Sequence, residues 1–460
     1  MQPGDSRIAN GQRKEDSRVR QFISRFTAAV LIAGFVLMAG TDYAKADVTS
    51  VPQVLNDETD DSEPSMQQKP LSGSAKNQTN GIQPFKTKSR KADKAFAGAM
   101  ANASVKLLQK TMKTDKTGGN ILISPDSIFT ALSIVENGAS GKTRKEIRKA
   151  MGGISVGKYN QYLSTLHRKL ERARGITYTS ANSLWYKEGT IRLKKSFLQK
   201  IVSYHQAEVY SAPFSSQTVN DMNRWVYNHT NGKIPSIISR LDPSLRTAVI
   251  NAVYFKAKWE TPYLDTVRRT FHKADGGRQK AEMLEGCEDT FVKVNGAKGF
   301  IKKYEGGKVA FLGLLPPKGT SVDEYVKKLT GKDLIKGYRN RKTRGVRVLT
   351  RMPEFKYEYE VSLNKPLKKM GIRRAFKSTA DFSNMSDSRL RIDAVLHRTY
   401  IDLNKNGTEA SAATAIMMKA SAAPPERTSV KKVYLTRPFV YAILDVKSGA
   451  PLFIGVVKKV

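Results

Sequence analysis

Apolar residues recur at helical spacing from Ala92 onward, where the texture of the chain changes. The recurring positions are Phe96, Met100, Ala103, Leu107 and Leu108. Steps of three and four residues place them on one face, which predicts a long amphipathic helix and the start of the folded domain. Residues 120–124 then form a short apolar run typical of a strand. Ser124 and Pro125 open a second helix, since serine caps helices and proline suits the first helical turn.

Further helices are predicted before residue 175, and strands dominate after it. The helical segments are SIFTALSIVENGA, TRKEIRKAMG and YLSTLHRKLERARG. The strand segments, rich in β-branched and aromatic residues, are ITYTSANSLWY, TAVINAVYFKAKW, KVAFLGLLPP and VRVLTRMPEFKYEYEVSL. The C-terminal segments VYLTRPFVYAILDV and SGAPLFIGVVKK are typical of a hairpin. Helices first and strands later indicate one α+β domain over residues 92–460.

The N-terminal part of the chain lacks this pattern. A basic stretch precedes the apolar run 28–40, and Ala44-Lys45-Ala46 offers the small residues of a signal-peptidase site. We therefore predict a signal peptide over residues 1–46 and a secreted protein, extracellular or periplasmic according to the host. The alternative is an uncleaved membrane anchor, for which the apolar run is short. Residues 47–91 are polar and include DETDDSE, so we expect a flexible, disordered tail there.

The chain carries a formal net charge of +38. Such a charge favours an anionic partner, whether polysaccharide, nucleic acid or lipid surface. The alternative is a solvated basic surface without a specific partner. The sole cysteine, Cys287, excludes an intramolecular disulfide and a thiolate metal cluster.

Enzyme motifs are incomplete in this sequence. GASGKT at 138–143 resembles a phosphate-binding loop, but Glu136 stands where that loop needs its first glycine. No GxSxG motif occurs, and the histidines lack zinc-ligand spacing. Triads can still be assembled from distant residues. We predict a protein that is not an enzyme and that uses no metal and no cofactor.

Five segments carry the most specific signal in the sequence. They are ILISPDSIFTALSIVENGASGKTRKEI, MNRWVYNHTNGKI, TAVINAVYFKAKWE, MPEFKYEYEVSLNKPLKKMGI and ADFSNMSDSRLRIDAVLHRTYIDLNKNGTEASAATA. In this order they resemble the serpin family of serine protease inhibitors over residues 92–460. The resemblance implies the serpin fold, with N-terminal helices packed on large mixed and antiparallel sheets. It also implies an exposed reactive centre loop near the C-terminus, here about residues 405–434.

The resemblance assigns roles to individual residues. A polar shutter beneath the centre of the main sheet would consist of Ser124, Ser127, Asn251 and His397. A breach at the top of that sheet would contain Trp259 and Glu354. The hinge that starts the loop would comprise Lys405, Gly407, Thr408, Glu409, Ala410, Ser411, Ala412, Ala413 and Thr414. The reactive bond would be Ser421-Ala422, with Ala420-Ser421 as the alternative. Without these roles, the shutter residues would be a buried cluster that satisfies its own hydrogen bonds.

The hinge sequence itself suits a strand that enters a sheet. With period two, one face would carry Thr408, Ala410, Ala412, Thr414, Ile416 and Met418. This face is uncharged and mostly small, and it meets no proline before Pro424, so nothing on it would obstruct insertion between two strands. The alternative is a flexible alanine-rich loop.

The family's mechanism implies suicide inhibition. The serine of the target protease attacks the loop, an acyl-enzyme forms, and the cut loop inserts into the sheet and carries the protease along. A small residue at Ser421 or Ala420 points to an elastase-like or subtilisin-like protease, whereas a trypsin-like protease would need Lys419. We expect a monomer that forms a covalent complex with its target. The alternatives are a non-inhibitory serpin that carries another molecule and a polyanion-binding protein.

Two basic features add expectations of their own. Lys405 stands where the family usually has an acidic residue, and Glu354 occupies the position of its basic partner, so the pair looks charge-swapped. The helix at 162–175 should place its leucines inward and show four basic side chains outward. These are Arg168, Lys169, Arg172 and Arg174. Several serpins bind heparin-like polymers on this helix, and the alternative is a plain solvated face.

Overall fold

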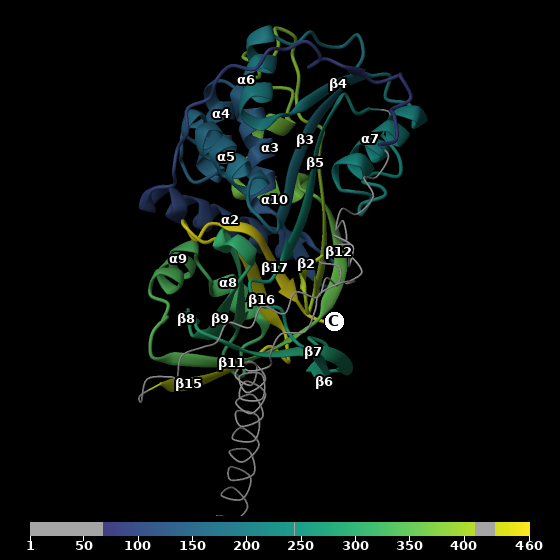
Figure 1. The fold of residues 1–460 in the computed structure, drawn as a ribbon. Coiled ribbons are helices and arrows are strands. Elements are labelled where there is room, and N and C mark those ends of the chain that lie inside the picture. The colour runs from purple at the N-terminus through teal and green to yellow at the C-terminus, as the bar shows by residue number, and fades with distance from the viewer. Residues whose placement is uncertain (1–67, 243, 410–427) are drawn as a thin grey trace, which may run out of the picture. The chain divides into compact units, whose positions relative to one another are not determined.

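The computed structural model describes residues 68–242, 244–409 and 428–460. Within them, helices lie mainly in the first half and strands mainly in the second (Figure 1). The helices are α2 (Lys94–Thr114), α3 (Pro125–Gly138), α4 (Gly141–Ala150), α5 (Val156–Glu171), α6 (Lys195–His205), α7 (Ser216–His229), α8 (Val322–Lys328), α9 (Gly331–Arg339) and α10 (Asn364–Met370). This order is the predicted α+β class.

The strands of the described residues form three sheets. The main sheet has the order β1 (Lys76–Asn77), β4 (Glu208–Ala212), β3 (Ile176–Lys187), β5 (Thr247–Lys258), β14 (Gly407–Thr408), β13 (Ala394–Asn404) and β12 (Phe355–Ser362). The second sheet has the order β2 (Ile121–Ile123), β17 (Pro451–Val457), β16 (Phe439–Asp445), β10 (Val309–Leu315), β9 (Ala297–Lys303) and β8 (Phe291–Val294). The third sheet has the order β15 (Ser429–Tyr434), β11 (Val346–Pro353), β7 (Arg278–Glu288) and β6 (Thr266–His272).

The central strand β5 is covered on both faces, which explains its nearly unbroken apolar sequence. Ala248, Ile250 and Ala252 pack in one cluster with Trp225 of α7. The alternate residues Val249 and Val253 belong to the main core, on the side of α3. A strand buried on both faces reads as a continuous apolar run.

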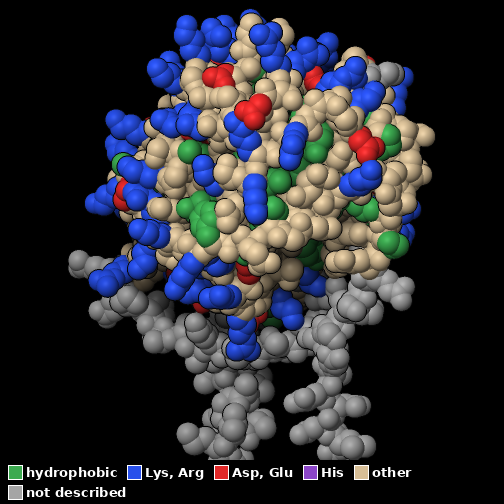
Figure 2. All heavy atoms as spheres, turned by 90° about the horizontal axis from the view of Figure 1, so that it is seen from above, with side chains coloured by type: hydrophobic (Ala, Val, Ile, Leu, Met, Phe, Trp, Pro, Cys, Tyr) green, Lys and Arg blue, Asp and Glu red, His purple; other side chains and the backbone are tan. Residues whose placement is uncertain are grey.

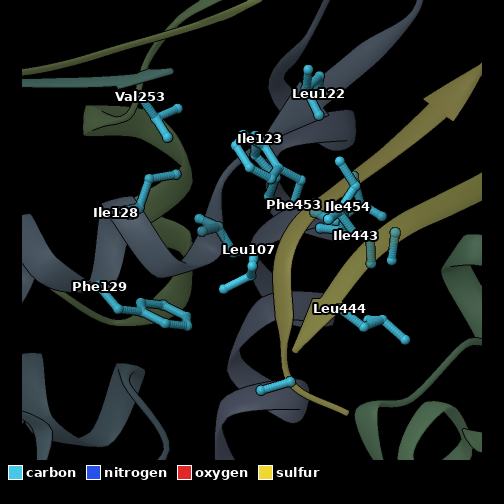
Figure 3. Close-up of a cluster of buried hydrophobic side chains, with 14 of the residues drawn as sticks. Leu107, Leu122, Ile123, Ile128, Phe129, Val253, Ile443, Leu444, Phe453 and Ile454 are labelled. Carbon is cyan, nitrogen blue, oxygen red and sulfur yellow. The ribbon is translucent and has the colours of Figure 1, made fainter. Parts of the chain in front are cut away.

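The main core lies where α2 and α3 meet the second sheet (Figure 3). Side chains from six elements converge there, among them Leu107, Leu122, Ile123, Ile128, Phe129, Val253, Ile443, Leu444, Phe453 and Ile454. Helix α3 is buried along its whole length, and its cap is made as predicted, because the Ser124 side chain accepts from the Ser127 N–H. Burial of each large apolar side chain contributes about 1.5–3 kcal/mol, so this core positions α3 firmly behind the main sheet.

Residues 68–91 differ from the flexible tail that we predicted over 47–91. Strand β1 pairs with β4, with Lys76 opposite Ser211. The buried carboxylate of Asp221 accepts the Ser72 N–H at 2.8 Å and the Ser72 and Ser74 hydroxyls at 2.6 and 3.0 Å. Backbone pairing and polar contacts to α7 hold this segment, so it needs no apolar period of its own. The predicted signal peptide and residues 47–67 lie outside the described residues.

The described helices include none that is both long and apolar enough to cross a membrane.

Candidate functional site

The seam between β5 and β13 is the centre of the candidate site. The two strands pair in parallel from Ala248 opposite Ala394 to Val253 opposite Thr399. Beyond that point β14 lies between them and is antiparallel to both. The described start of the predicted hinge is therefore already a short strand of the main sheet.

Gly407 is required at the entrance of this seam. A Cβ atom there would collide with the Ala257 carbonyl oxygen and lie 2.9 Å from the Lys258 Cα. Thr408 follows, is 1% exposed, and its hydroxyl lies 2.7 Å from the Tyr304 hydroxyl. Because β5 approaches so closely, only glycine fits at position 407. The side chain of Thr408 points into the core.

Glu409 marks the point where the chain leaves the sheet. Its φ of 51° is left-handed, which interrupts the extended strand. Its backbone N–H donates to the Asp402 carbonyl, and its carboxylate lies 3.0 Å from the Lys233 ammonium. Burial raises the pKa of Glu409, and the hydrogen bond and charge of Lys233 oppose that rise. The remaining hinge residues, Ala410 to Thr414, and the reactive bond at residues 420–422 lie outside the described residues.

Trp259 closes the seam at the end where β14 lies. Its indole stacks on Tyr304, with ring centroids 4.3 Å apart, and its Nε1 donates to the Asn404 carbonyl at 3.0 Å. Its backbone N–H donates to the Asn406 carbonyl at 2.9 Å. The tryptophan therefore binds the end of β13 and the turn that leads into β14.

The structure shows a different contact from the predicted ion pair between Glu354 and Lys405. Glu354 accepts the backbone N–H of Lys405 at 2.8 Å, and the two side chains form no ion pair within 4 Å in the part of the chain described. Burial raises the pKa of Glu354, while the hydrogen bond and the positive charge of Lys405 oppose that rise. Any residue except proline supplies a backbone N–H. The direct contact is consequently one of carboxylate to backbone, and the charge of Lys405 acts on Glu354 only from a longer distance.

The four predicted shutter residues come together beneath the seam. Asn251 donates to the Ser127 carbonyl at 3.0 Å and to the Ser127 hydroxyl at 2.5 Å. His397 lies directly opposite Asn251 in the parallel pairing, and its Nδ1 is 2.7 Å from the Asn251 Oδ1. The Ser124 N–H donates to His397 Nε2 at 3.2 Å. All four side chains are completely buried.

These contacts fix the protonation of His397. Nε2 accepts from a backbone N–H, so the ring proton is on Nδ1, from which it is donated to Asn251. Burial lowers the pKa of His397 to about 3. The neutral ring thus uses both nitrogens, and a second proton would break the contact with Ser124.

Sequence reasoning missed two members of the site. Asn182 of β3 lies opposite Asn251 and accepts its amide N–H at 2.7 Å. Tyr304 supports both Trp259 and Thr408. A lone asparagine within the strand TSANSLW was a usable signal for Asn182. Nothing local distinguished Tyr304, because its role depends on chain segments far away in the sequence.

The proposed polyanion helix is only partly as expected. Leu163, Leu166 and Leu170 of α5 are buried. Lys169, however, pairs with the buried Asp445 at 2.5 Å, and Arg168 donates to Thr87 at 2.7 Å. Arg174 lies 3.3 Å from Glu305, and Arg172 is exposed. The expectation of four outward basic groups is wrong for Lys169, whose charge holds α5 to the second sheet.

Comparisons with known proteins agree with this geometry. A family model described as Serpin (serine protease inhibitor) matches residues 99–460. An uncharacterized serpin-like protein of Thermococcus kodakarensis is 30% identical over 73% of this chain and 80% of its own length. Leukocyte elastase inhibitor A of Mus musculus is 28% identical over 76% of this chain and 95% of its own length. The crystal structure of the thermophilic serpin tengpin in its native state has 37% identity and a TM-score of 0.77, covering 84% of this chain and all of that one. The chain therefore belongs to the serpin family.

Proposed function

We propose that this serpin is a secreted, monomeric suicide-substrate inhibitor of a serine protease with elastase-like or subtilisin-like specificity. The protease cleaves the loop between Ser421 and Ala422 and remains attached as an acyl-enzyme. The freed loop then inserts into the main sheet and distorts the protease before the ester is hydrolysed. The chain acts as a substrate that traps its enzyme and catalyses nothing itself.

The position of β14 is the observation that carries this proposal. Gly407 and Thr408 already bond on both sides, to β5 and to β13. Just beyond them the two flanking strands meet each other in parallel. A strand that continues from Thr408 would find backbone donors and acceptors on both sides once the flanking strands separate.

The orientation of Thr408 favours insertion of the residues that follow. Its side chain is buried against Tyr304, so it defines the inward face of the new strand. Alternation would place Ala410, Ala412 and Thr414 on the same face. These side chains are small and uncharged, so burying them costs little.

The closed seam must hold until the loop is cut. Asn251 binds Ser127, Asn182 and His397, and these contacts span α3 and three neighbouring strands. The Lys233–Glu409 pair and the left-handed turn at Glu409 resist further entry of the hinge. Together they support a native state that inserts its loop only after cleavage.

The predicted reactive bond and one relative support the choice of target. Ser421 or Ala420 would place a small side chain in the specificity pocket of the protease. The murine relative is named as an inhibitor of leukocyte elastase. Secretion follows from the predicted signal peptide and would bring the chain to extracellular or periplasmic proteases.

The test is to incubate the chain, without residues 1–46, with pancreatic elastase and with subtilisin. We expect a complex that survives denaturing electrophoresis, and a released C-terminal peptide beginning at Ala422 by intact-mass analysis. Cleavage only after Lys419 or Arg427 would contradict the assigned bond. Cleavage without any covalent complex would contradict the inhibitory mechanism.

A matched pair of variants separates insertion from recognition. Thr414→Arg places a charge on the predicted inward face, so it should turn the inhibitor into a cleaved substrate. Ala413→Arg adds the same charge to the opposite face and should leave complex formation largely intact. Equal behaviour of the two variants would refute the alternation on which the mechanism depends.

A further inference from the structure

The edge of the third sheet carries an uncompensated basic cluster next to the end of the reactive loop. Residues 339–347 and 428–434 contain seven Lys or Arg and no Asp or Glu. We define the β11–β15 basic cluster as Lys342, Arg344, Arg347, Lys431 and Lys432. Lys342, Arg344 and Lys432 are exposed, and Arg347 and Lys431 are half-buried.

Backbone pairing holds most of these charges along the edge of the third sheet, and a bridge to Phe291 of β8 holds Lys342. Strands β11 and β15 are parallel, with Arg347 opposite Val430 and Leu349 opposite Lys432. The Ser429 N–H donates to the Gly345 carbonyl at 3.0 Å, which fixes the turn carrying Arg344 beside the start of β15. Val430 is 52% exposed between these basic groups. The edge thus carries one exposed apolar side chain among basic ones.

One carboxylate elsewhere on the same sheet pairs with two basic side chains. Glu285 of β7 lies 2.8 Å from Arg351 and 3.5 Å from Arg269. By contrast, no carboxylate of the described residues lies within 4 Å of a charged nitrogen in the β11–β15 basic cluster. Its positive charges are therefore not compensated by ion pairs with the described residues.

The predicted reactive bond is close along the chain to β15, so a protease bound there would lie near this edge. Five residues lie between Ala422 and Thr428. The two positions are therefore at most about 20–22 Å apart when the chain is fully extended. A protease of about 250 residues has a radius of gyration of about 18 Å, so its body extends well past the bond it attacks. A typical protein–protein interface buries about 800 Å² on each partner.

We infer that the β11–β15 basic cluster is a second docking surface for the target protease, and that it selects a protease with acidic side chains around its active-site cleft. This inference rests on the proposed function and adds the charge of the partner to it. Opposite charges would steer the two proteins together before the loop is cut, which raises the association rate more than the final stability.

Basic side chains are widespread on this protein, so position must be separated from net charge. Figure 2 shows that Lys and Arg far outnumber Asp and Glu on the face seen from the top of Figure 1 as well. Helix α4 lies towards that upper end, whereas β11 and β15 lie at the lower end (Figure 1). Lys145 and Lys149 of α4 are exposed and provide a matched control.

The experiment compares two double variants with the same change in net charge. Arg344→Glu/Lys432→Glu reverses the docking surface, and Lys145→Glu/Lys149→Glu reverses the distant control surface. The probe is one subtilisin, used unmodified and with its lysines succinylated, and both forms are calibrated by active-site titration. The measured quantity is the second-order rate constant of covalent complex formation at 50 and 500 mM NaCl.

We expect the unaltered inhibitor to trap the succinylated protease about tenfold faster at low salt than at high salt. Arg344→Glu/Lys432→Glu should lose about that factor at low salt, and the control should stay within about twofold of the unaltered inhibitor. Equal rates for the two variants, or no salt dependence in the unaltered inhibitor, would overturn the docking surface. Absence of any covalent complex with either protease would instead contradict the proposed function itself.

Discussion

Protonation of His397 should open the seam of the main sheet. In the closed seam the neutral ring donates to Asn251 through Nδ1 and accepts from Ser124 through Nε2. Protonated histidine has two donors and no acceptor, so the contact with the Ser124 N–H becomes repulsive. Acid therefore acts directly on the bonds that join β5, β13 and α3.

The size of this effect follows from the pKa. Burial lowers the pKa of His397 to about 3, from an ordinary value of about 6.5. The stability contributed by the neutral ring is complete above about pH 6.5 and is lost as the pH falls towards 3. At pH 5 the loss is about 2 kcal/mol, because each pKa unit is worth about 1.4 kcal/mol. If all of it lowers the barrier to opening, the sheet opens about 30 times faster.

The assay follows uncleaved protein as it converts to polymer or to the self-inserted monomer, by native electrophoresis at pH 7.5 and pH 5. His397→Gln should lose most of the acceleration at pH 5. His205→Gln is the matched control, because burial lowers the pKa of His205 to about 3 as well, but its ring bonds Asn160 of α5 and lies away from the seam. Burial raises the pKa values of Glu354 and Glu409, so acid favours the closed seam at these two residues and opposes the effect of His397. Each variant is therefore compared with the unaltered protein at the same pH. An unchanged acceleration in His397→Gln would refute the reasoning.

Three further substitutions test the hinge and the N-terminal segment. Glu354→Ala leaves the Lys405 N–H without its acceptor, at a cost of about 1–3 kcal/mol, and should speed polymer formation in size-exclusion profiles. Lys405→Met keeps the N–H and should not speed it. A strong effect of Lys405→Met would instead support the charge pair. Gly407→Ala should displace β14 and raise the number of inhibitor molecules cleaved per protease trapped, while Gly157→Ala, which meets no atom within 4 Å, should not. Asp221→Ala removes the acceptor of Ser72 and Ser74, so limited proteolysis should cut residues 68–80 sooner; unchanged protection would contradict that anchoring.

The amino-acid sequence was sufficient to predict the fold class and most of the candidate site. The apolar steps of α2, the capped start of α3 and the β-branched run of β5 each follow from local periodicity. The five motifs then predicted which distant residues would meet, and Ser124, Ser127, Asn251 and His397 do form one cluster. Local pattern and a specific resemblance were sufficient because each of these residues sits in a segment with a clear signal.

Tertiary structure alone decided the contacts between segments whose local sequence carries no such signal. Residues 68–91 look like a polar tail, yet Asp221 and the free edge of β4 supply the hydrogen bonds that order them. Lys169 looks like a surface charge, yet it forms an ion pair with Asp445, which is far away in the sequence. Glu354 looks like an ionic partner of Lys405, yet its carboxylate reaches the backbone N–H. In each case the partner is set by how the sheets and helices pack, because a polar group binds whatever complementary group the fold brings within reach.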